Sequence, residues 1–170
     1  MATTAINYST NTTITISPAS LATSSDFTAG RESNEIDNVT TNKYVDAIVQ
    51  GKLTVGTSPT ANTEIRIYVW GADTSLATTA LGVLDGTDSA ETIVNTGFLA
   101  SALKQAATIS VIQATSDITY NFVPFSVATL FGGNMPKFWG LFVSHNTVAA
   151  LHATAGNHAL SFNGIKYDVA

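Results

Sequence analysis

Two segments of the chain alternate between apolar and polar side chains with a period of two. The first, "KYVDAIVQGKLTV", covers residues 43–55, and the second, "NTEIRIYVW", covers residues 62–70. This period is typical of half-buried strands in an antiparallel sheet. The predicted inward-facing side chains are Val45, Ala47, Val49, Leu53, Val55, Ile65, Ile67 and Val69. The Gly, Pro and Asn of the intervening "GTSPTAN" favour a turn, so residues 43–70 are predicted to form one long β-hairpin.

The C-terminal half contains further strand patterns. "TISVIQA" and "ITYNFVPFSV" predict two strands, and Pro124 in the second lacks a backbone donor, which favours an edge or a bulge. After the turn "FGGNMP", the segment "KFWGLFVSH" is almost wholly apolar and predicts a strand buried on both faces.

The last predicted strand changes its phase. Leu160 and Phe162 are at even positions, whereas Ile165, Tyr167 and Val169 are at odd ones, and "NG" lies where the phase changes. Asn-Gly at such a place indicates a bulge or a hairpin turn. A bulge within one terminal strand is the prediction.

Residues 71–106 show no strong period and predict a long connection between strands, in which "GFLASALKQAAT" fits either a helical turn or the start of a strand. About eight strands with one long connection predict an all-β fold, a two-sheet antiparallel sandwich that is jelly-roll-like. Residues 1–20 would form an N-terminal arm or first strand, and residues 21–170 a single β-sandwich domain.

Composition agrees with this fold and excludes several functions. The 26 Thr and the many Val and Ile favour strands. A net charge of −5 with scattered Lys and Arg excludes the basic stripe that nucleic acid or an anionic membrane would need. The chain has no Cys, no signal-like N-terminus and no apolar run of membrane-spanning length, so we expect synthesis and folding in a cytosol.

Candidate chemical groups have simpler interpretations. His145, His152 and His158 could form a His₃ metal site, and Asp85, Asp88 and Glu91 of "DGTDSAE" offer calcium-type oxygen ligands. Carboxylate pairs for glycoside hydrolysis could be drawn from Glu32, Glu35, Asp37 and Asp46. Chance clustering explains the histidines better than a metal site does, a solvated turn explains "DGTDSAE" better than a calcium site does, and any acidic loop would contain such carboxylate pairs. We therefore expect no catalytic residue, no cofactor and no metal.

The densest charge lies in "TAGRESNEIDN", residues 28–38, although charged residues are only 11% of the chain. Arg31 could bind a carboxylate of a neighbouring chain, or it could pin its own loop to Asp37 or Asp46. Tyr68 and Trp70 alternate with the inward-facing residues of their strand, so they are either covered by loops or exposed to a partner. The candidate interface comprises Arg31, Glu32, Asp37, Tyr68 and Trp70.

Several motifs resemble a group of small structural proteins of tailed bacteriophages. These are "TAGRES", "IDN", the pair "YVDAIVQGKLTVGTSPTANTEIRIYVWG", "PFSVATLFGG", "MPKFWGLFV" and "ALHATAGNH", which together cover about residues 28–170. None is a catalytic signature. The resemblance implies a non-enzymatic capsid decoration, or cement, protein that is β-rich, often a jelly roll, and frequently a trimer on the shell.

The resemblance implies that the partners are the major capsid protein and the chain itself, as a homotrimer. The expected location is the capsid surface of the virion, after synthesis in the host bacterial cytoplasm. The alternative is a tail or fibre-associated carbohydrate- or receptor-binding β-sandwich module. Such a module would need exposed aromatic side chains in a groove, whereas a cement protein would bury them at a flat interface. An enzyme is a third alternative, but the sequence contains no acid–base pair in a recognisable setting.

Overall fold

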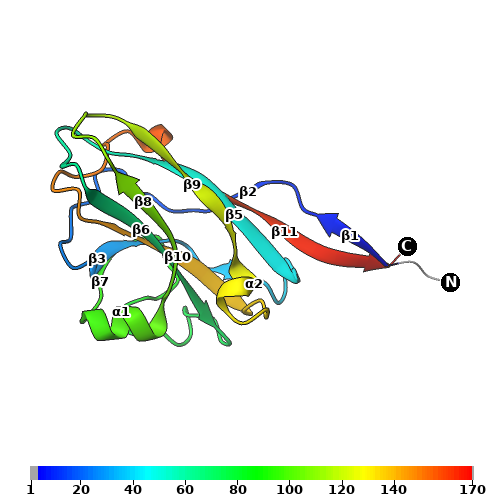
Figure 1. The fold of residues 1–170 in the computed structure, drawn as a ribbon. Helices are drawn as coiled ribbons and strands as arrows, with labels where there is room; N and C mark the ends of the chain where they lie inside the picture. Colours follow the sequence, from blue (N-terminus) through cyan, green and yellow to red (C-terminus); the bar gives the residue numbers. More distant parts are fainter. Residues whose placement is uncertain (1–3, 170) are drawn as a thin grey trace.

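The computed structural model describes residues 4–169 and contains two antiparallel β-sheets packed face to face (Figure 1). Strands account for 44% of the structure and helices for 8%. The predicted all-β, two-sheet sandwich is confirmed, and its jelly-roll-like connectivity stays a prediction. Of the expected N-terminal segment 1–20, the first three residues lie outside the described part. No helix in the described range is long and apolar enough to cross a membrane.

Sheet A contains β1, β11, β5 and β9 in that order, with β2 also paired to β11, and sheet B contains β7, β3, β10, β6 and β8, with β4 also paired to β10. The bounds are β1 (Thr4–Tyr8), β2 (Thr12–Thr13), β3 (Ala29–Glu32), β4 (Ile36–Asp37), β5 (Asp46–Thr54), β6 (Thr63–Ala72), β7 (Ala90–Thr92), β8 (Lys104–Val111), β9 (Thr119–Ser126), β10 (Phe138–His145) and β11 (Ala159–Val169). The helices are α1 (Thr96–Ala102), α2 (Val127–Leu130) and the 3₁₀ turn η1 (Ala155–Asn157).

The predicted hairpin of residues 43–70 is wrong. Both of its strands exist, but β5 pairs with β11 and β9 in sheet A, whereas β6 pairs with β10 and β8 in sheet B. The "GTSPTAN" segment therefore connects one sheet to the other. The apolar sides of β5 and β6 meet in the interior of the sandwich, where Val49 and Ile67 are fully buried in one core cluster. The period-two pattern identified the inward face of each strand correctly except at Val45, which lies just before β5 and is 41% exposed. The pattern carries no information on which strand lies beside another.

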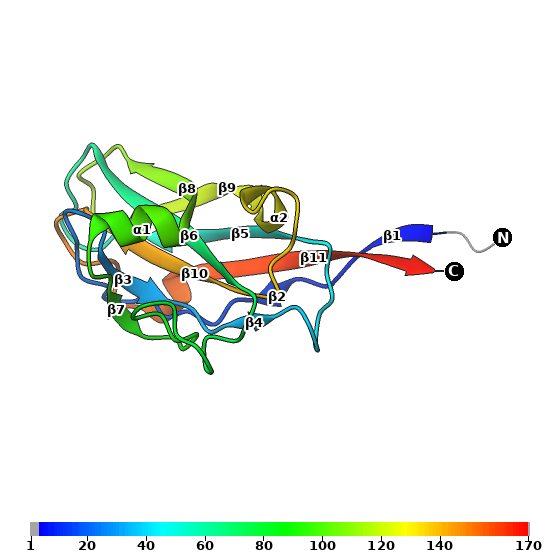
Figure 2. The same ribbon diagram turned by 90° about the horizontal axis from the view of Figure 1, so that it is seen from below.

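Sheet B is covered on both of its faces. Its inner face packs against sheet A around Trp139. Its outer face packs under residues 73–103, here called the covering segment, which include α1 (Figure 2). The covering segment also contains β7, which pairs with β3 at the edge of sheet B. This arrangement confirms that the strand predicted in "KFWGLFVSH" is buried on both faces. This strand is β10, in which only Phe138 is partly exposed, and the exposed Lys137 lies just before it.

The region 71–106 contains both structures that its sequence allowed. Asn95 caps α1 by accepting a hydrogen bond from the backbone N–H of Phe98 at 2.9 Å. The helix ends at Ala102, and β8 begins two residues later. Helix and strand are therefore consecutive rather than alternative in "GFLASALKQAAT".

Pro124 has no backbone N–H to donate, and it lies in an edge strand beside a bulge, as predicted. Its strand, β9, is at the edge of sheet A, and the register with β5 shifts between Val49 and Gly51, where β9 has an extra residue. The predicted bulge at Asn163–Gly164, in contrast, is absent, because β11 keeps an unbroken register with β5 from Ala159 to Ile165. The extra residue lies instead in the segment that pairs with β11 on its other edge. Tyr8 pairs with Ile165 and Thr12 pairs with Phe162, so four steps along the N-terminal segment correspond to three steps along β11.

The outer half of β11 and its partner β1 leave the body of the sandwich together. Both views show this two-stranded ribbon projecting beyond the other strands, with the two ends of the described chain at its tip (Figures 1 and 2). We call residues 4–8 and 165–169 the arm. Ser9 fixes its base, because its N–H donates to the Gly164 carbonyl and its hydroxyl accepts from the Gly164 N–H, both at 2.8 Å.

Candidate functional site

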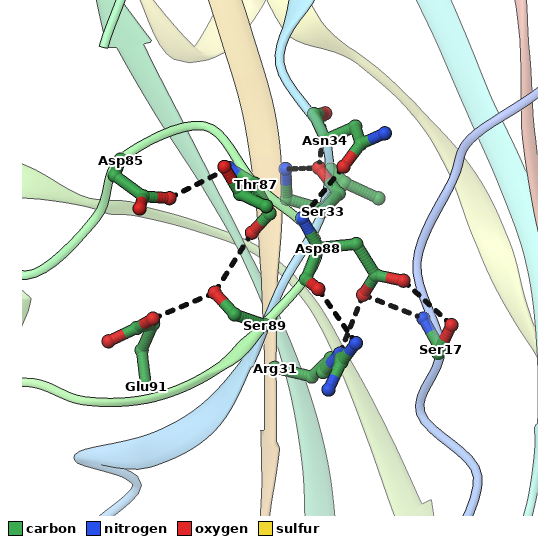
Figure 3. Close-up of polar contacts among 10 residues, drawn as sticks. Ser17, Arg31, Ser33, Asn34, Asp85, Thr87, Asp88, Ser89 and Glu91 are labelled. Carbon is green, nitrogen blue, oxygen red and sulfur yellow. Dashed lines mark hydrogen bonds and ion pairs between the residues drawn. The ribbon is translucent and has the colours of Figure 1, made fainter. Parts of the chain in front are cut away.

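Three charged residues of the 28–38 region, Arg31, Glu32 and Glu35, hold the covering segment onto sheet B. Arg31 lies in β3, and its Nε is 2.6 Å from Oδ1 of Asp88 while its Nη2 donates to the Asp88 carbonyl at 2.8 Å (Figure 3). Asp88 also accepts hydrogen bonds from the backbone and the hydroxyl of Ser17. Burial alone would raise the pKa of Asp88, but the hydrogen bonds from Arg31 and Ser17 outweigh it and hold the pKa below its ordinary value.

Glu32 lies one residue further along β3 and is fully buried. Its carboxylate accepts the backbone N–H groups of Asp85 at 3.1 Å and Gly86 at 3.0 Å. Burial raises the pKa of Glu32 to about 7 in spite of these two bonds. Glu32 therefore fixes the 85–86 turn from inside the protein.

Glu35 adds a third attachment to the same segment. Its carboxylate accepts from the Ser75 hydroxyl and from the Leu76 N–H, each at 2.7 Å. Its own N–H donates to the Gly86 carbonyl at 2.8 Å. The acidic side chains of this region thus satisfy backbone donors of a loop that would otherwise lack partners.

Asp37 has a local role at the start of a turn. Its carboxylate accepts from the N–H groups of Val39 and Thr40 and from the Thr40 hydroxyl. The hydrogen bonds from Thr40 are the main reason that the pKa of Asp37 is lowered. Asp46, the other carboxylate considered for Arg31, instead accepts from Ser126 and from the Ala128 N–H at the start of α2.

The internal pin considered for Arg31 is therefore present, but its partner is Asp88 rather than Asp37 or Asp46. Asp88 is 57 residues away along the chain, inside the "DGTDSAE" motif, whose sequence indicates only a calcium ligand set or a solvated turn. The signal that could have joined the two motifs is their composition, since both concentrate charge in a chain that has little of it.

Tyr68 and Trp70 lie beneath the covering segment and not on the surface. Tyr68 is 4% exposed and Trp70 is fully buried, in a second core cluster with Phe142 of β10. The Trp70 ring occupies the space above Gly140, where a Cβ would come within 2.4 Å of it. Glu32 is buried as well. Three of the five candidate interface residues, Glu32, Tyr68 and Trp70, are therefore internal, and their prediction as interface residues is wrong. Arg31 and Asp37 are partly exposed.

The histidines take part in loop structure. Nε2 of His145 is 2.9 Å from the Leu21 carbonyl, and Nε2 of His158 is 2.8 Å from the carbonyl of His152. Burial lowers the pKa of both His145 and His158. Among residues 4–169, no three His, Asp or Glu side chains lie close enough together to hold a metal ion.

The carboxylates of "DGTDSAE" do not converge on a common point. Asp85 accepts from the Thr87 N–H, Asp88 faces Arg31, and Glu91 accepts from the Ser89 hydroxyl (Figure 3). A hollow of about 320 Å³ lies beside Arg31 and Glu91, lined also by Gly30 and Leu21. Because Arg31 and Glu32 are already bonded to the covering segment, the described geometry is that of a structural clamp rather than of an acid–base pair.

Comparison of the chain with family models, with curated proteins and with solved structures found no match.

The surface feature that sequence reasoning missed is the arm. Ile6, Tyr8 and Tyr167 are 60%, 64% and 59% exposed. The signal was the phase change at Asn163–Gly164, which marks where the apolar side chains of β11 leave the core face and begin to point outward.

Proposed function

We propose that this protein is a non-enzymatic structural protein of a tailed-phage virion, a capsid decoration protein that binds the outer surface of the head. The observation that carries the proposal is the use of the charged cluster: Arg31, Glu32 and Glu35 all fasten the chain's own covering segment. The region with the most candidate chemistry is therefore part of the architecture. The motif resemblance to phage structural proteins supplies the biological setting.

Physical reasoning supports a role in protein contact. A charge-poor surface coated with Ser and Thr can press against another protein without burying unpaired charges, which would be costly. A homotrimer that contacts several copies of a major capsid protein would gain from multivalency, because later contacts form at high effective concentration. A protein that binds only the assembled lattice stabilises that lattice by linkage.

The alternative, a tail or fibre-associated carbohydrate-binding module, has less support. It would need aromatic side chains in an accessible groove, and the two aromatic residues of the candidate interface, Tyr68 and Trp70, are buried. The carboxylates considered for an enzymatic role, Glu32, Glu35, Asp37 and Asp46, each accept hydrogen bonds from other groups of the same chain.

The experiment is a binding and stability assay on phage heads. Purified protein is added to heads that lack it, and heads of an unrelated phage are the control. The proposal expects saturable binding to the matching heads alone and a higher temperature of DNA release. Imaging of the particle then locates the chain. Density at the tail tip, or heads whose stability is unchanged after saturation, would contradict the decoration role.

A further inference from the structure

The arm has one apolar face and one polar face. Because paired residues of an antiparallel ribbon point to the same side, the register Ile6↔Tyr167 and Tyr8↔Ile165 places these four side chains on one face. The opposite face carries Asn7, Lys166 and Asp168, which bond to one another: Asn7 Nδ2 is 2.5 Å and Lys166 Nζ 3.4 Å from the Asp168 carboxylate.

This apolar face lies outside the core of the sandwich. Leu160 and Phe162 of β11 point into the core and are each 2% exposed. Ile165 and Tyr167 have the other parity and therefore point to the other side. The extra residue between Tyr8 and Thr12 changes the parity of the partner strand in the same place, so both strands turn their large apolar side chains outward together.

An isolated two-stranded ribbon is marginally stable in water, and a contiguous exposed apolar patch marks an interaction site. The strands on either side of the arm end at its base: β5 pairs with β11 as far as Ile165, and β2 pairs only with Ser161 and Phe162. Within the described residues, no other strand pairs with the arm beyond Ile165 at its base. The ribbon therefore presents both its outer edges and its apolar face to other molecules.

The pattern of the face indicates its partner. A two-fold rotation about the centre of the Asn7↔Lys166 pair exchanges Ile6 with Ile165 and Tyr8 with Tyr167. The four residues thus form a checkerboard with internal two-fold symmetry, which can stack on an identical face with each Tyr against an Ile. Self-complementarity of this kind defines an isologous contact.

From these observations we infer that the arm is a self-association surface, whose occupant is the same apolar face of the arm of a second copy of this chain. No charged side chain lies on this face among the described residues, so two chains of net charge −5 can meet here without opposing like charges. This inference goes beyond the proposed function and does not depend on a phage head.

The size of the contact predicts a reversible association. A fully buried aromatic side chain covers about 150–250 Å², so two Tyr and one Ile at about 60% exposure give each face on the order of 400 Å². Two faces together then bury about 800 Å², which is less than the roughly 1,200 Å² of a stable interface. The expected state is a dimer that forms at high protein concentration and dissociates on dilution.

The first test is sedimentation of the purified full chain over a wide range of concentration. The wild type should change from monomer toward dimer, and Tyr8→Ser with Tyr167→Ser should weaken the association at least tenfold. Val123→Ser is the matched control, because Val123 is 82% exposed on the edge strand β9. A wild type that is monomeric throughout, or equal weakening by the control, would overturn the inference.

The second test locates the contact and does not depend on how the Ser variants fold. The chain has no Cys, so a single introduced Cys is the only thiol. Ile6→Cys should give covalent dimers with a short bis-maleimide, whereas Asn7→Cys on the opposite face should not. Equal cross-linking at both positions would overturn the inference. A trimer that is insensitive to both sets of changes would also overturn it, while leaving the proposed decoration trimer intact.

Discussion

At the scale of single residues, the ion pair between Arg31 and Asp88 is a stabilising contact of the charged cluster. Their side chains are 23% and 14% exposed and are joined by one short contact at 2.6 Å, with a second bond from Arg31 to the Asp88 backbone. A hydrogen bond between charged groups in such a place contributes more than an exposed ion pair, which is commonly worth less than about 1 kcal/mol.

Arg31→Ala should therefore lower the free energy of unfolding by about 1–3 kcal/mol, and a double-mutant cycle with Asp88→Asn should recover much of this as coupling. Chemical denaturation measures both values. Lys137→Ala, which removes an exposed contact to Asp73, is the control and should change stability by less than about 0.5 kcal/mol. A similar loss in both variants would argue against the clamp.

Glu32 should make stability depend on pH. Because its pKa is raised from 4.5 to about 7 in the folded protein, the folded state binds more protons than the unfolded state between these values. The stabilisation that Glu32 contributes to the folded state is fully present below pH 4.5 and is lost as the pH rises through 7. The buried histidines act in the opposite direction, since their lowered pKa values cost stability as the pH falls below their ordinary value.

The measurement is the difference in unfolding free energy between the wild type and Glu32→Gln at several pH values. Both proteins contain the same histidines, so their effect cancels. Relative to the variant, the wild type should lose stability from pH 4.5 to 7.5, by up to about 3 kcal/mol at roughly 1.4 kcal/mol per pKa unit. A difference that does not vary with pH would show that the Glu32 pKa is not raised.

At the scale of elements, the sequence predicted which segments form strands better than it predicted their neighbours. Alternation in residues 43–55 and 62–70 identified the buried sides of β5 and β6, but the two strands lie in different sheets. The parity change in β11 was also visible, but not its cause, because the extra residue lies on the paired strand near Ser9. Pairing partners distant in sequence leave no mark in a local pattern.

The candidate site shows the same limit. Charge density in residues 28–38 identified Arg31 and Glu32 as unusual, but their partners Asp88, Asp85 and Gly86 are more than fifty residues away. Tyr68 and Trp70 were ambiguous because a strand covered on both faces and a strand with one exposed aromatic face have similar sequences. The third layer that decides between them comes from the covering segment, which has no strong period of its own.

Gly164 lies within β11 and packs against Tyr44 in the loop before β5. A Cβ at this position would come within 2.3 Å of the Tyr44 ring, which packs edge-on to Phe162 at 6.2 Å between centroids. Gly164→Ala should therefore displace Tyr44 and lower stability by about 1–3 kcal/mol, as overpacking does. Thermal denaturation tests this, with Gly156→Ala as the control, because a Cβ there meets nothing within 4 Å. Equal stability of the two variants would contradict the close packing.

At the scale of the whole molecule, net charge should oppose association while the arm favours it. Two chains of charge −5 repel each other over a distance set by salt, about 30 Å at 0.01 M and about 10 Å at 0.1 M. Dimerisation through an uncharged face should therefore become tighter as NaCl rises from 0.01 to about 0.3 M. Sedimentation equilibrium at several salt concentrations measures the change. Weakening with salt would indicate a contact made by ion pairs instead.

The covering of sheet B on both faces gives the protein two optical reporters. The chain has two tryptophans: Trp139 lies between the sheets and Trp70 lies under the covering segment. Protein segments can open locally below the global unfolding free energy. Trp70→Phe would leave fluorescence that follows separation of the sheets, and Trp139→Phe would leave fluorescence that follows release of the outer layer. The difference between their denaturation midpoints would then measure how far the third layer unfolds independently of the sandwich it covers.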